Sequence, residues 1–303
     1  MPQTDLRTME TIGFIGLGHM GGNMAARFLD AGYDVNGTAR QQARAQWLVD
    51  RGLRWLDTPR EVAEQSDVVL TSLPDDATVE AVASGPDGLL AGLGPDRVWA
   101  DLSTISPNAS RGLADRARAR GAAMVDAPVS GSVPQVQEGT LSILVGGDQE
   151  AFSRLEPVLG ILGTPTRIGD NGQGLALKLA INVNLAVQML AFSEGLLFAQ
   201  DAGVDAHLAA RVMTATAIGS PMLRARVPLV LDRPEETWFD ISLMHKDIGL
   251  ALATGRQLGA PMPSAALVEE VLAYAARTGF EHRDIAAMFE VLGRSGAHAT
   301  QDR

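Results

Sequence analysis

The chain has 303 residues, an apolar fraction of 46% and a formal net charge of −11 at pH 7, which fits a folded protein with substantial cores in two domains. The acidic balance argues against nucleic acids and anionic membranes as general partners. Because the chain has no cysteine and its five histidines lack ligand spacing, we expect neither disulfides nor a bound metal. The first residues lack the basic and apolar regions of a signal peptide, so we expect a cytoplasmic location.

A glycine-rich turn follows the first predicted strand, Thr11 to Ile15, and precedes a predicted helix from Met20 to Leu29. Its GxGxxG spacing permits a tight turn, close approach of the backbone to a pyrophosphate, and close packing of helix on strand. An ordinary glycine-rich turn is the alternative, but the strand and helix around it favour a dinucleotide site at the helix N-terminus. The residues expected to contact the cofactor here are Gly16, Leu17, Gly18, His19, Met20 and Gly21.

The second predicted strand, Tyr33 to Thr38, ends without an acidic residue. A carboxylate at this place would bond the ribose hydroxyls of NAD and repel the extra phosphate of NADP. Here Thr38 is placed to donate a hydrogen bond, and Arg40 to grip a 2′-phosphate through its planar guanidinium. The sequence therefore predicts a preference for NADP over NAD, with NAD still possible. The alternative is that Arg40 is a solvated charge at the start of a helix.

Further apolar runs alternate with helical patterns at Asp67 to Leu73, Val98 to Leu102, Ala122 to Val125 and Leu141 to Val145. They predict an α/β fold with a Rossmann-type, doubly wound and mainly parallel sheet. Open sheets of this type bind ligands beyond the carboxyl ends of their strands, so we expect Leu73, Pro74 and Thr104 to line the cofactor cleft. Pro74 and Pro107 also fit the first turns of helices, and both interpretations can hold together.

The stretch from Asp126 to Ser132 lies just past a predicted strand and offers hydroxyl and backbone N–H donors. It fits a cradle for a substrate carboxylate, with Ser130, Gly131 and Ser132 as the binding residues. A tight connection between two strands has a similar sequence, so the residues alone leave both interpretations open.

From about Gly169 the strand signals end and the chain becomes helical in period. We therefore predict two domains, a dinucleotide-binding domain at 1–168 and an all-helical substrate and dimerisation domain at 169–303. The predicted helices cover Gly172 to Ala202, Ala206 to Thr216, Ile241 to Leu258 and Ser264 to Thr278. The first is mostly apolar, but it contains groups that are costly in lipid, namely Lys178, Asn182, Asn184, Gln188 and Glu194. We expect it to be buried by protein and to link the two domains.

Gly174, Lys178 and Asn182 are spaced at i, i+4 and i+8, so they share one face of this long helix. The glycine leaves room beside the two polar side chains. We expect partial burial to lower the pKa of Lys178, so that its ammonium protonates a carbonyl oxygen during hydride transfer. Asn182 would orient the lysine or the substrate hydroxyl. The alternative is an interfacial lysine whose ammonium reaches water.

Together these motifs resemble the β-hydroxyacid dehydrogenase family, which includes 3-hydroxyisobutyrate dehydrogenase, tartronate semialdehyde reductase and the glyoxylate and succinic semialdehyde reductases. The resemblance extends from Ile12 to about Leu292. The matching segments, in the family's order, are 13–21, 101–104, 126–131, Gly172-Gln173-Gly174 with Lys178 and Asn182, and Lys246-Asp247 with Leu250-Ala251. Motifs found in one order are far more specific than any single motif.

The resemblance implies a role for residues in both predicted domains. Lys178 would be the general acid/base supported by Asn182, Ser130 and Gly131 would hold the substrate carboxylate, and Thr104 would lie near the nicotinamide.

In the second domain, the resemblance implies that Lys246 reaches substrate and cofactor and that Asp247 helps to fix it. Trp238 and Phe239 would shape the substrate pocket. The alternative for Lys246 and Asp247 is a surface ion pair, which contributes little stability.

The chain departs from the family pattern at three positions. Ile181 stands where the first of two asparagines is often found, which leaves Asn182 alone after the lysine. Ser132 replaces a common third glycine of the carboxylate loop, and this serine also occurs among reductase-like members, which favours a semialdehyde substrate. Ala39 stands where an asparagine often precedes the cofactor-reading arginine, which weakens that contact.

The sequence thus predicts an NADP-preferring oxidoreductase that interconverts a short 3-hydroxy acid and its semialdehyde. An imine reductase is the nearest alternative enzyme, but those proteins usually lack the catalytic lysine. A non-catalytic, cofactor-binding dimer is the alternative from another class, and it would not be expected to keep Lys178 with Asn182. Because the helical half carries more apolar surface than one chain covers, we expect a homodimer or homotetramer.

Overall fold

The computed structural model describes residues 10–232 and 237–299, and the chain divides into two compact units, Met1–Lys178 and Leu179–Arg303. The boundary predicted from sequence, between residues 168 and 169, lies at the end of the last strand of the first unit. The long helix α9 (Gln173–Asp201) begins in the first unit and continues into the second.

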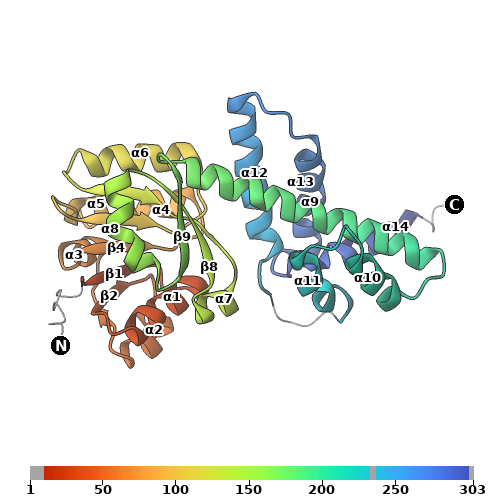
Figure 1. Cartoon of the computed structure of the whole chain (residues 1–303), viewed down its shortest axis with the longest axis horizontal. Helices are drawn as coiled ribbons and strands as arrows, with labels where there is room; N and C mark the ends of the chain where they lie inside the picture. Colours follow the sequence, from red (N-terminus) through yellow and green to blue (C-terminus); the bar gives the residue numbers. More distant parts are fainter. Residues whose placement is uncertain (1–9, 233–236, 300–303) are drawn as a thin grey trace, which may run out of the picture. The chain divides into compact units, whose positions relative to one another are not determined.

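The first unit contains a mostly parallel sheet with the strand order β3-β2-β1-β4-β5-β6-β8-β7, and β9 pairs with β8 (Figure 1). The strands are β1 (Ile12–Ile15), β2 (Val35–Thr38), β3 (Arg54–Trp55), β4 (Val68–Thr71), β5 (Val98–Asp101), β6 (Ala123–Asp126), β7 (Val129–Ser130), β8 (Leu141–Gly146) and β9 (Gly163–Gly169). β8 runs antiparallel to β6 and β7. The chain moves outward from β1 to β3 and returns on the other side of β1 at β4, so the strand order reverses between them, where such sheets bind ligands. The predicted Rossmann-type sheet is confirmed.

Both faces of the sheet are buried. Successive residues of a strand point to opposite faces, and both sets of side chains lie in cores. On β4, Val68 and Leu70 share a core with Phe28 and Leu155, whereas Val69 packs with Leu113 in a separate core. The covering helices are α1 (His19–Asp30), α2 (Gln42–Val49), α3 (Pro59–Glu64), α4 (Asp76–Ala83), α5 (Leu89–Gly92), α6 (Pro107–Arg118), α7 (Val133–Glu138) and α8 (Gln149–Leu159). This double burial explains why the strands read as continuous apolar runs.

The strands β3, β7 and β9 carry no strand signal that the sequence analysis detected. β3 and β7 have two residues each, which is too short for a periodic pattern. β9 contains Pro165 and pairs with β8 alone, so it is an edge strand, where proline is tolerated.

In the second unit, the described residues are helical apart from turns and an isolated bridge between Asp240 and Asp284. The elements are the remainder of α9, α10 (Ala206–Ala215), α11 (Pro221–Leu231), α12 (Ile241–Leu258), α13 (Pro263–Ala275), a π-helical turn (Ala276–Phe280), a 3₁₀ turn (Ile285–Ala287) and α14 (Met288–Ala299). The predicted helical second half is confirmed. α11 and α14 lie in the half predicted to be helical but were not named as separate helices, and α11 holds Pro228 in its interior, where a proline normally signals a helix end.

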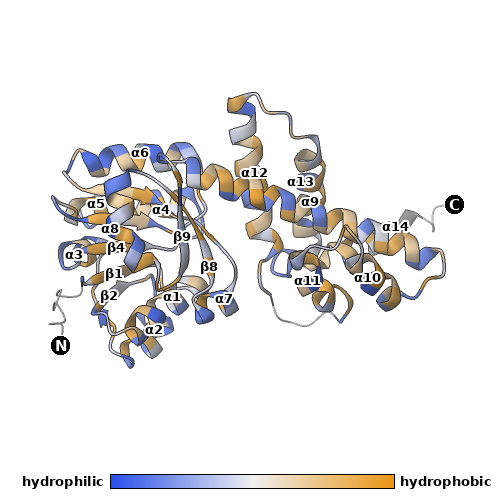
Figure 2. Cartoon of the chain, viewed as in Figure 1, coloured by the Kyte–Doolittle hydropathy of each residue, from blue (hydrophilic) through white to orange (hydrophobic). Residues whose placement is uncertain are grey.

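The helix α9 is long and apolar enough to cross a membrane by length and composition (Figure 2). Part of the helix packs inside the protein, since 39% of its most apolar 18-residue window is buried. Leu175 belongs to a core of the first unit, and Met189 and Phe192 are buried in the core of the second. Asn182 and Ser193 are also buried along it.

Candidate active site

The glycine-rich turn between β1 and α1 has the geometry expected of a phosphate-binding turn. Gly16 has a φ of +96°, and a Cβ there would overlap the Ser72 carbonyl oxygen. A Cβ on Gly21 would overlap the Gly16 carbonyl oxygen, which is how closely α1 packs on the turn. A Cβ on Gly18, the residue preceding α1, would meet nothing within 4 Å. The turn is therefore tightly packed at Gly16 and Gly21, and it has open space at Gly18, next to the helix N-terminus.

The described residues at this turn fit a dinucleotide. The first turn of α1 contains no acidic residue, and no side chain caps it at Gly18. Its backbone N–H groups and the positive end of the helix dipole therefore favour a phosphate. His19 is exposed here, while Leu17 is buried and Met20 is half-buried.

The end of β2 lies against the same turn. The Gly16 N–H donates to the Thr38 carbonyl oxygen at 3.0 Å, and Ile15 is paired with Thr38 in the sheet. Thr38 is buried, whereas Arg40 and Arg44 are exposed. Arg40 therefore lies two residues after the end of β2, which is hydrogen-bonded to the phosphate-binding turn.

The loops after β4 and β5 are tied together by buried polar groups. The Thr71 hydroxyl donates to Asp101 Oδ1 at 2.7 Å and accepts from the Trp99 indole N–H at 2.8 Å. The Leu73 N–H donates to the Ser103 hydroxyl at 2.9 Å, which joins one loop to the other. These bonds hold the predicted cofactor residues Leu73, Pro74 and Thr104 in loops at the carboxyl edge of the sheet.

The predicted carboxylate loop begins in β7 and ends at the first turn of α7. Ser130 pairs with Ser142 of β8, and Gly131 has a φ of +135° that favours glycine. Ser132 donates its backbone N–H to Gln135 Oε1 at 2.8 Å and its hydroxyl to the same oxygen at 2.9 Å. Ser132 therefore serves the start of α7, and Ser130 and Gly131 remain the candidate donors for a carboxylate.

Asp126, the last residue of β6, was in the predicted carboxylate stretch but not among the predicted site residues. Its carboxylate accepts from the N–H groups of Gly172 and Leu175 at the start of α9, at 2.6 and 3.1 Å, and from the Ser110 hydroxyl at 3.1 Å. Burial raises the pKa of Asp126 to about 6, against these donors, which lower it. The sequence signal that could have marked Asp126 is an acid at the end of an apolar predicted strand, directly before a polar loop.

Gly174 is required for a reason that the helix periodicity did not reveal. A Cβ on it would overlap the Leu144 carbonyl oxygen and lie 2.8 Å from both Asp126 Oδ2 and the Gly146 nitrogen. We expected Gly174 to make room for the polar side chains of Lys178 and Asn182. The structure explains this glycine by the close packing of α9 on β8. Lys178 is half-buried on α9.

In the second unit, Asp247 joins two predicted site residues. Its Oδ2 accepts from the Asn182 amide at 2.6 Å, and its Oδ1 lies 2.9 Å from Lys246 Nζ. Asn182 is 1% exposed and Asp247 2%, so this is a buried pair rather than a solvated surface contact. The ion pair of Lys246 and Asp247 therefore also fixes Asn182, 65 residues away in the sequence.

Trp238 and Phe239 precede α12 and are held by Asp284. Both of their backbone N–H groups donate to Asp284 Oδ2 at 3.0 Å. Arg226 lies 3.5 Å from Asp284 Oδ1 and stacks over the Trp238 ring at 5.7 Å. The segment that leads into α12 is thus fixed by a buried ion pair that the sequence did not indicate.

Among the residues whose side chains are described, no group of three or more His, Asp or Glu is arranged to hold a metal ion. The described polar clusters are instead joined through hydrogen bonds and ion pairs.

Both halves of the chain match known families. Residues 11–172 match the NAD binding domain of 6-phosphogluconate dehydrogenase, and residues 172–292 match the family described as NAD-binding of NADP-dependent 3-hydroxyisobutyrate dehydrogenase. A 3-hydroxyisobutyrate dehydrogenase of Pseudomonas aeruginosa is 35% identical over 91% of this chain and 96% of that protein. The 2-hydroxy-3-oxopropionate reductase of Escherichia coli is 33% identical over 95% of this chain and 98% of its own.

Among solved structures, 3-hydroxyisobutyrate dehydrogenase of Mycobacterium tuberculosis with L-serine has a TM-score of 0.84 at 30% identity, covering 94% of this chain and 99% of that one. The similarity thus spans both units and agrees with the phosphate-binding turn of the first. The chain belongs to the β-hydroxyacid dehydrogenase family and is an NAD(P)-dependent oxidoreductase that acts on CH–OH groups.

Proposed function

We propose that this protein is an NADP-preferring enzyme that interconverts a short 3-hydroxy acid and its semialdehyde, with Lys178 as the general acid/base. The observation that carries the proposal is the polar set on and beside α9. Lys178 and Asn182 lie one turn apart on that helix, and Asn182 is buried against Asp247. A buried amide–carboxylate pair and a half-buried lysine on an otherwise apolar helix mark a candidate functional site.

When held at the phosphate-binding turn, the nicotinamide cofactor would supply the hydride for the carbonyl carbon in reduction and would accept a hydride from the alcohol carbon in oxidation. Lys178 donates a proton to the carbonyl oxygen in reduction and takes it from the hydroxyl in oxidation. Ser130 and Gly131 orient the substrate by donating to its carboxylate. Asn182, held by Asp247, orients the lysine or the hydroxyl.

The residues at the end of β2 support the preference for NADP. Thr38 is fixed to the phosphate-binding turn, and Arg40, two residues later, is exposed and able to pair with a 2′-phosphate. The family matched by residues 172–292 is described by an NADP-dependent enzyme. We expect Arg40→Ala to lower kcat/KM for NADPH about tenfold or more while leaving NADH nearly unchanged, since a charge-assisted bond contributes about 1.5–3 kcal/mol. Arg118→Ala, an exposed arginine on α6, is the control, and equal losses with both cofactors would contradict the assignment.

The proposed substrate site also includes Lys246, Trp238 and Phe239. The proposed cofactor site also includes Lys246 and Asp247. The Lys246 side chain is partly exposed, and its Nζ lies 2.9 Å from Asp247 Oδ1, which fixes its direction. We expect Lys246→Met to raise KM for substrate or cofactor. Unchanged values of both would remove it from the site.

Exposed apolar residues of the second unit support self-association. Phe198 is 78% exposed on α9, and Leu208 and Val212 are exposed on α10. Because exposed large apolar side chains favour burial by a partner, we propose a homodimer or homotetramer. Light scattering of the full chain tests this, and a mass of about 32 kDa at all concentrations would contradict it.

The direct test of the proposed reaction follows NADPH oxidation with a panel of short carboxylate semialdehydes and glyoxylate, and, separately, cyclic imines. Semialdehyde turnover that Lys178→Ala abolishes supports the proposal. Turnover of imines alone would favour the imine-reductase alternative, and tight NADPH binding with no turnover would favour a non-catalytic dimer.

A further inference from the structure

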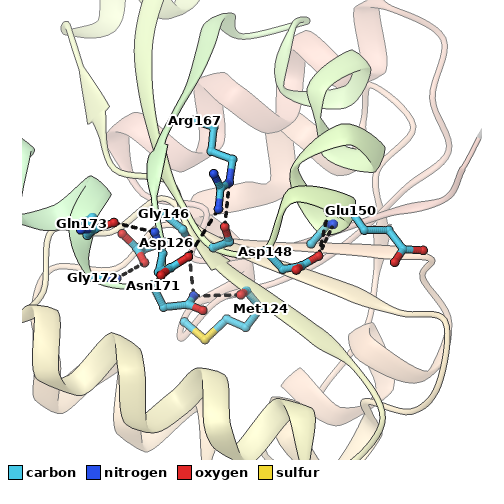
Figure 3. Close-up of polar contacts among 12 residues, drawn as sticks. Met124, Asp126, Gly146, Asp148, Glu150, Arg167, Asn171, Gly172 and Gln173 are labelled. Carbon is cyan, nitrogen blue, oxygen red and sulfur yellow. Dashed lines mark hydrogen bonds and ion pairs between the residues drawn. The ribbon is translucent and has the colours of Figure 1, made fainter.

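The start of α9 is anchored by a side chain from a neighbouring strand. Asp126 of β6 is fully buried, and its carboxylate accepts from the Gly172 N–H (Figure 3). The same carboxylate accepts from the Leu175 N–H. The Ser110 hydroxyl of α6 donates to the same carboxylate. One side chain thus connects β6, α6 and the first turn of the helix that carries Lys178.

The atoms around the Asp126 carboxylate are closely packed. A Cβ on Gly146 of β8 would lie 2.5 Å from Asp126 Oδ2 and 2.8 Å from the Gly174 nitrogen. On the opposite side a Cβ on Gly174 would also meet Asp126 Oδ2, at 2.8 Å. Asn171 adds a bond from its amide to the Met124 carbonyl oxygen of β6 at 2.9 Å. The helix therefore begins at a position defined by backbone atoms of two strands.

Asp126 is close in the sequence to the carboxylate loop and is bonded to the start of the helix that carries Lys178. Ser130 of the carboxylate loop follows Asp126 by four residues, and Lys178 follows the bonded Leu175 by three, which is about 4.5 Å along the helix axis. A shift of the first turn of α9 would therefore move the ammonium of Lys178 relative to the loop that holds the substrate.

A carboxylate suits this place better than other short polar groups. Each of its two oxygens accepts from a different N–H of the first turn, whereas an amide would turn an NH₂ group toward one of those donors. Negative charge is also stabilised at a helix N-terminus. The cap of α8 provides a contrast, because Asp148 accepts from Glu150 and Ala151 in a helix that bears no proposed site residue.

From this geometry we infer that Asp126 is a positioning residue for catalysis: it fixes the first turn of α9 and, through it, the place of Lys178 relative to Ser130 and Gly131. The inference rests on the proposed role of Lys178. Because a misplacement of about 1 Å can lower a rate about 100-fold, the effect of losing Asp126 should appear in kcat rather than in cofactor affinity.

The test is a double-mutant cycle of Asp126→Ala and Lys178→Ala in the full chain, with Asp148→Ala as the matched loss of a helix cap. We expect Asp126→Ala to lower kcat about 10- to 100-fold with KM changed less than about threefold, and Asp148→Ala to leave both unchanged. In the Lys178→Ala background, Asp126→Ala should lower the remaining rate less than about twofold. Equal losses in both backgrounds, or an Asp126→Ala enzyme as active as Asp148→Ala, would overturn the inference.

Hydrogen exchange provides a readout that does not depend on turnover. Amides at the start of α9 should lose protection in Asp126→Ala and keep it in Asp148→Ala, and retained protection in both would overturn the anchoring. If Lys178→Ala kept the wild-type kcat, the proposed reaction mechanism would fail while the exchange result still reported on the anchor. Should Asp126→Ala not fold, Ser110→Ala removes one donor to the same carboxylate, and the same cycle is expected to give a smaller, again non-additive, loss in kcat.

Discussion

Gly18→Ala separates cofactor binding from folding more sharply than any other substitution in the phosphate-binding turn. A Cβ at this position meets nothing within 4 Å, and Gly18 has a φ of −75°, which alanine adopts without strain. We therefore expect the free energy of unfolding to change by less than about 0.5 kcal/mol. The methyl group would enter the open space where we place the pyrophosphate. Losing one charge-assisted hydrogen bond there, about 1.5–3 kcal/mol, corresponds to a rise in Kd of about 10- to 100-fold.

Two other glycines act as controls for this experiment. Gly112 is exposed within α6 and also has open space around it, so Gly112→Ala should raise stability by about 0.5–1 kcal/mol without changing the Kd for NADPH. Gly21→Ala would place a Cβ against the Gly16 carbonyl oxygen and should cost about 3 kcal/mol or more. Urea unfolding measures stability, and titration with NADPH measures affinity. Wild-type affinity in Gly18→Ala would refute the placement of the pyrophosphate.

The remaining predictions concern buried charges. Because burial raises the folded-state pKa of Asp126 to about 6 from 3.8, the folded protein holds this proton more tightly than the unfolded chain, so stability should fall as pH rises from about 4 to about 6. The size is on the order of 3 kcal/mol, and urea unfolding across this range should show it in wild type and not in Asp126→Asn, while equal pH profiles would contradict it. Arg226→Ala should cost about 3–5 kcal/mol, because Arg226 and Asp284 are 8% and 6% exposed and the lost partner leaves a buried charge. Arg118→Ala, which breaks an exposed pair, should cost less than about 1 kcal/mol, and similar losses for the two arginines would refute the argument.

Local patterns were sufficient to predict much of the fold. The helix Ile241–Leu258 has the predicted bounds, because its apolar period is regular and Gly259 ends it in a left-handed conformation. The glycine spacing after β1 likewise predicted the phosphate-binding turn, since Gly16 has a positive φ and a Cβ on Gly21 would overlap the Gly16 carbonyl oxygen five residues earlier. Such features depend on residues that are neighbours in the sequence.

Contacts between distant residues were not predictable in the same way. Asp126 bonds to Gly172 and Leu175, and Asn182 bonds to Asp247, across 46 to 65 residues. No periodicity encodes which strand end meets which helix start. Gly174 illustrates the limit, because its helix face was predicted while the strand that requires it to be glycine was not.

The proposed role of Lys178 as proton donor can be measured in a single turnover. NADPH bound to the wild type and to Lys178→Ala is oxidised by a carboxylate semialdehyde, and the rate is followed. We expect a rate about 100- to 10,000-fold lower in Lys178→Ala, with NADPH affinity and stability unchanged. A wild-type rate in Lys178→Ala would show that another group transfers the proton.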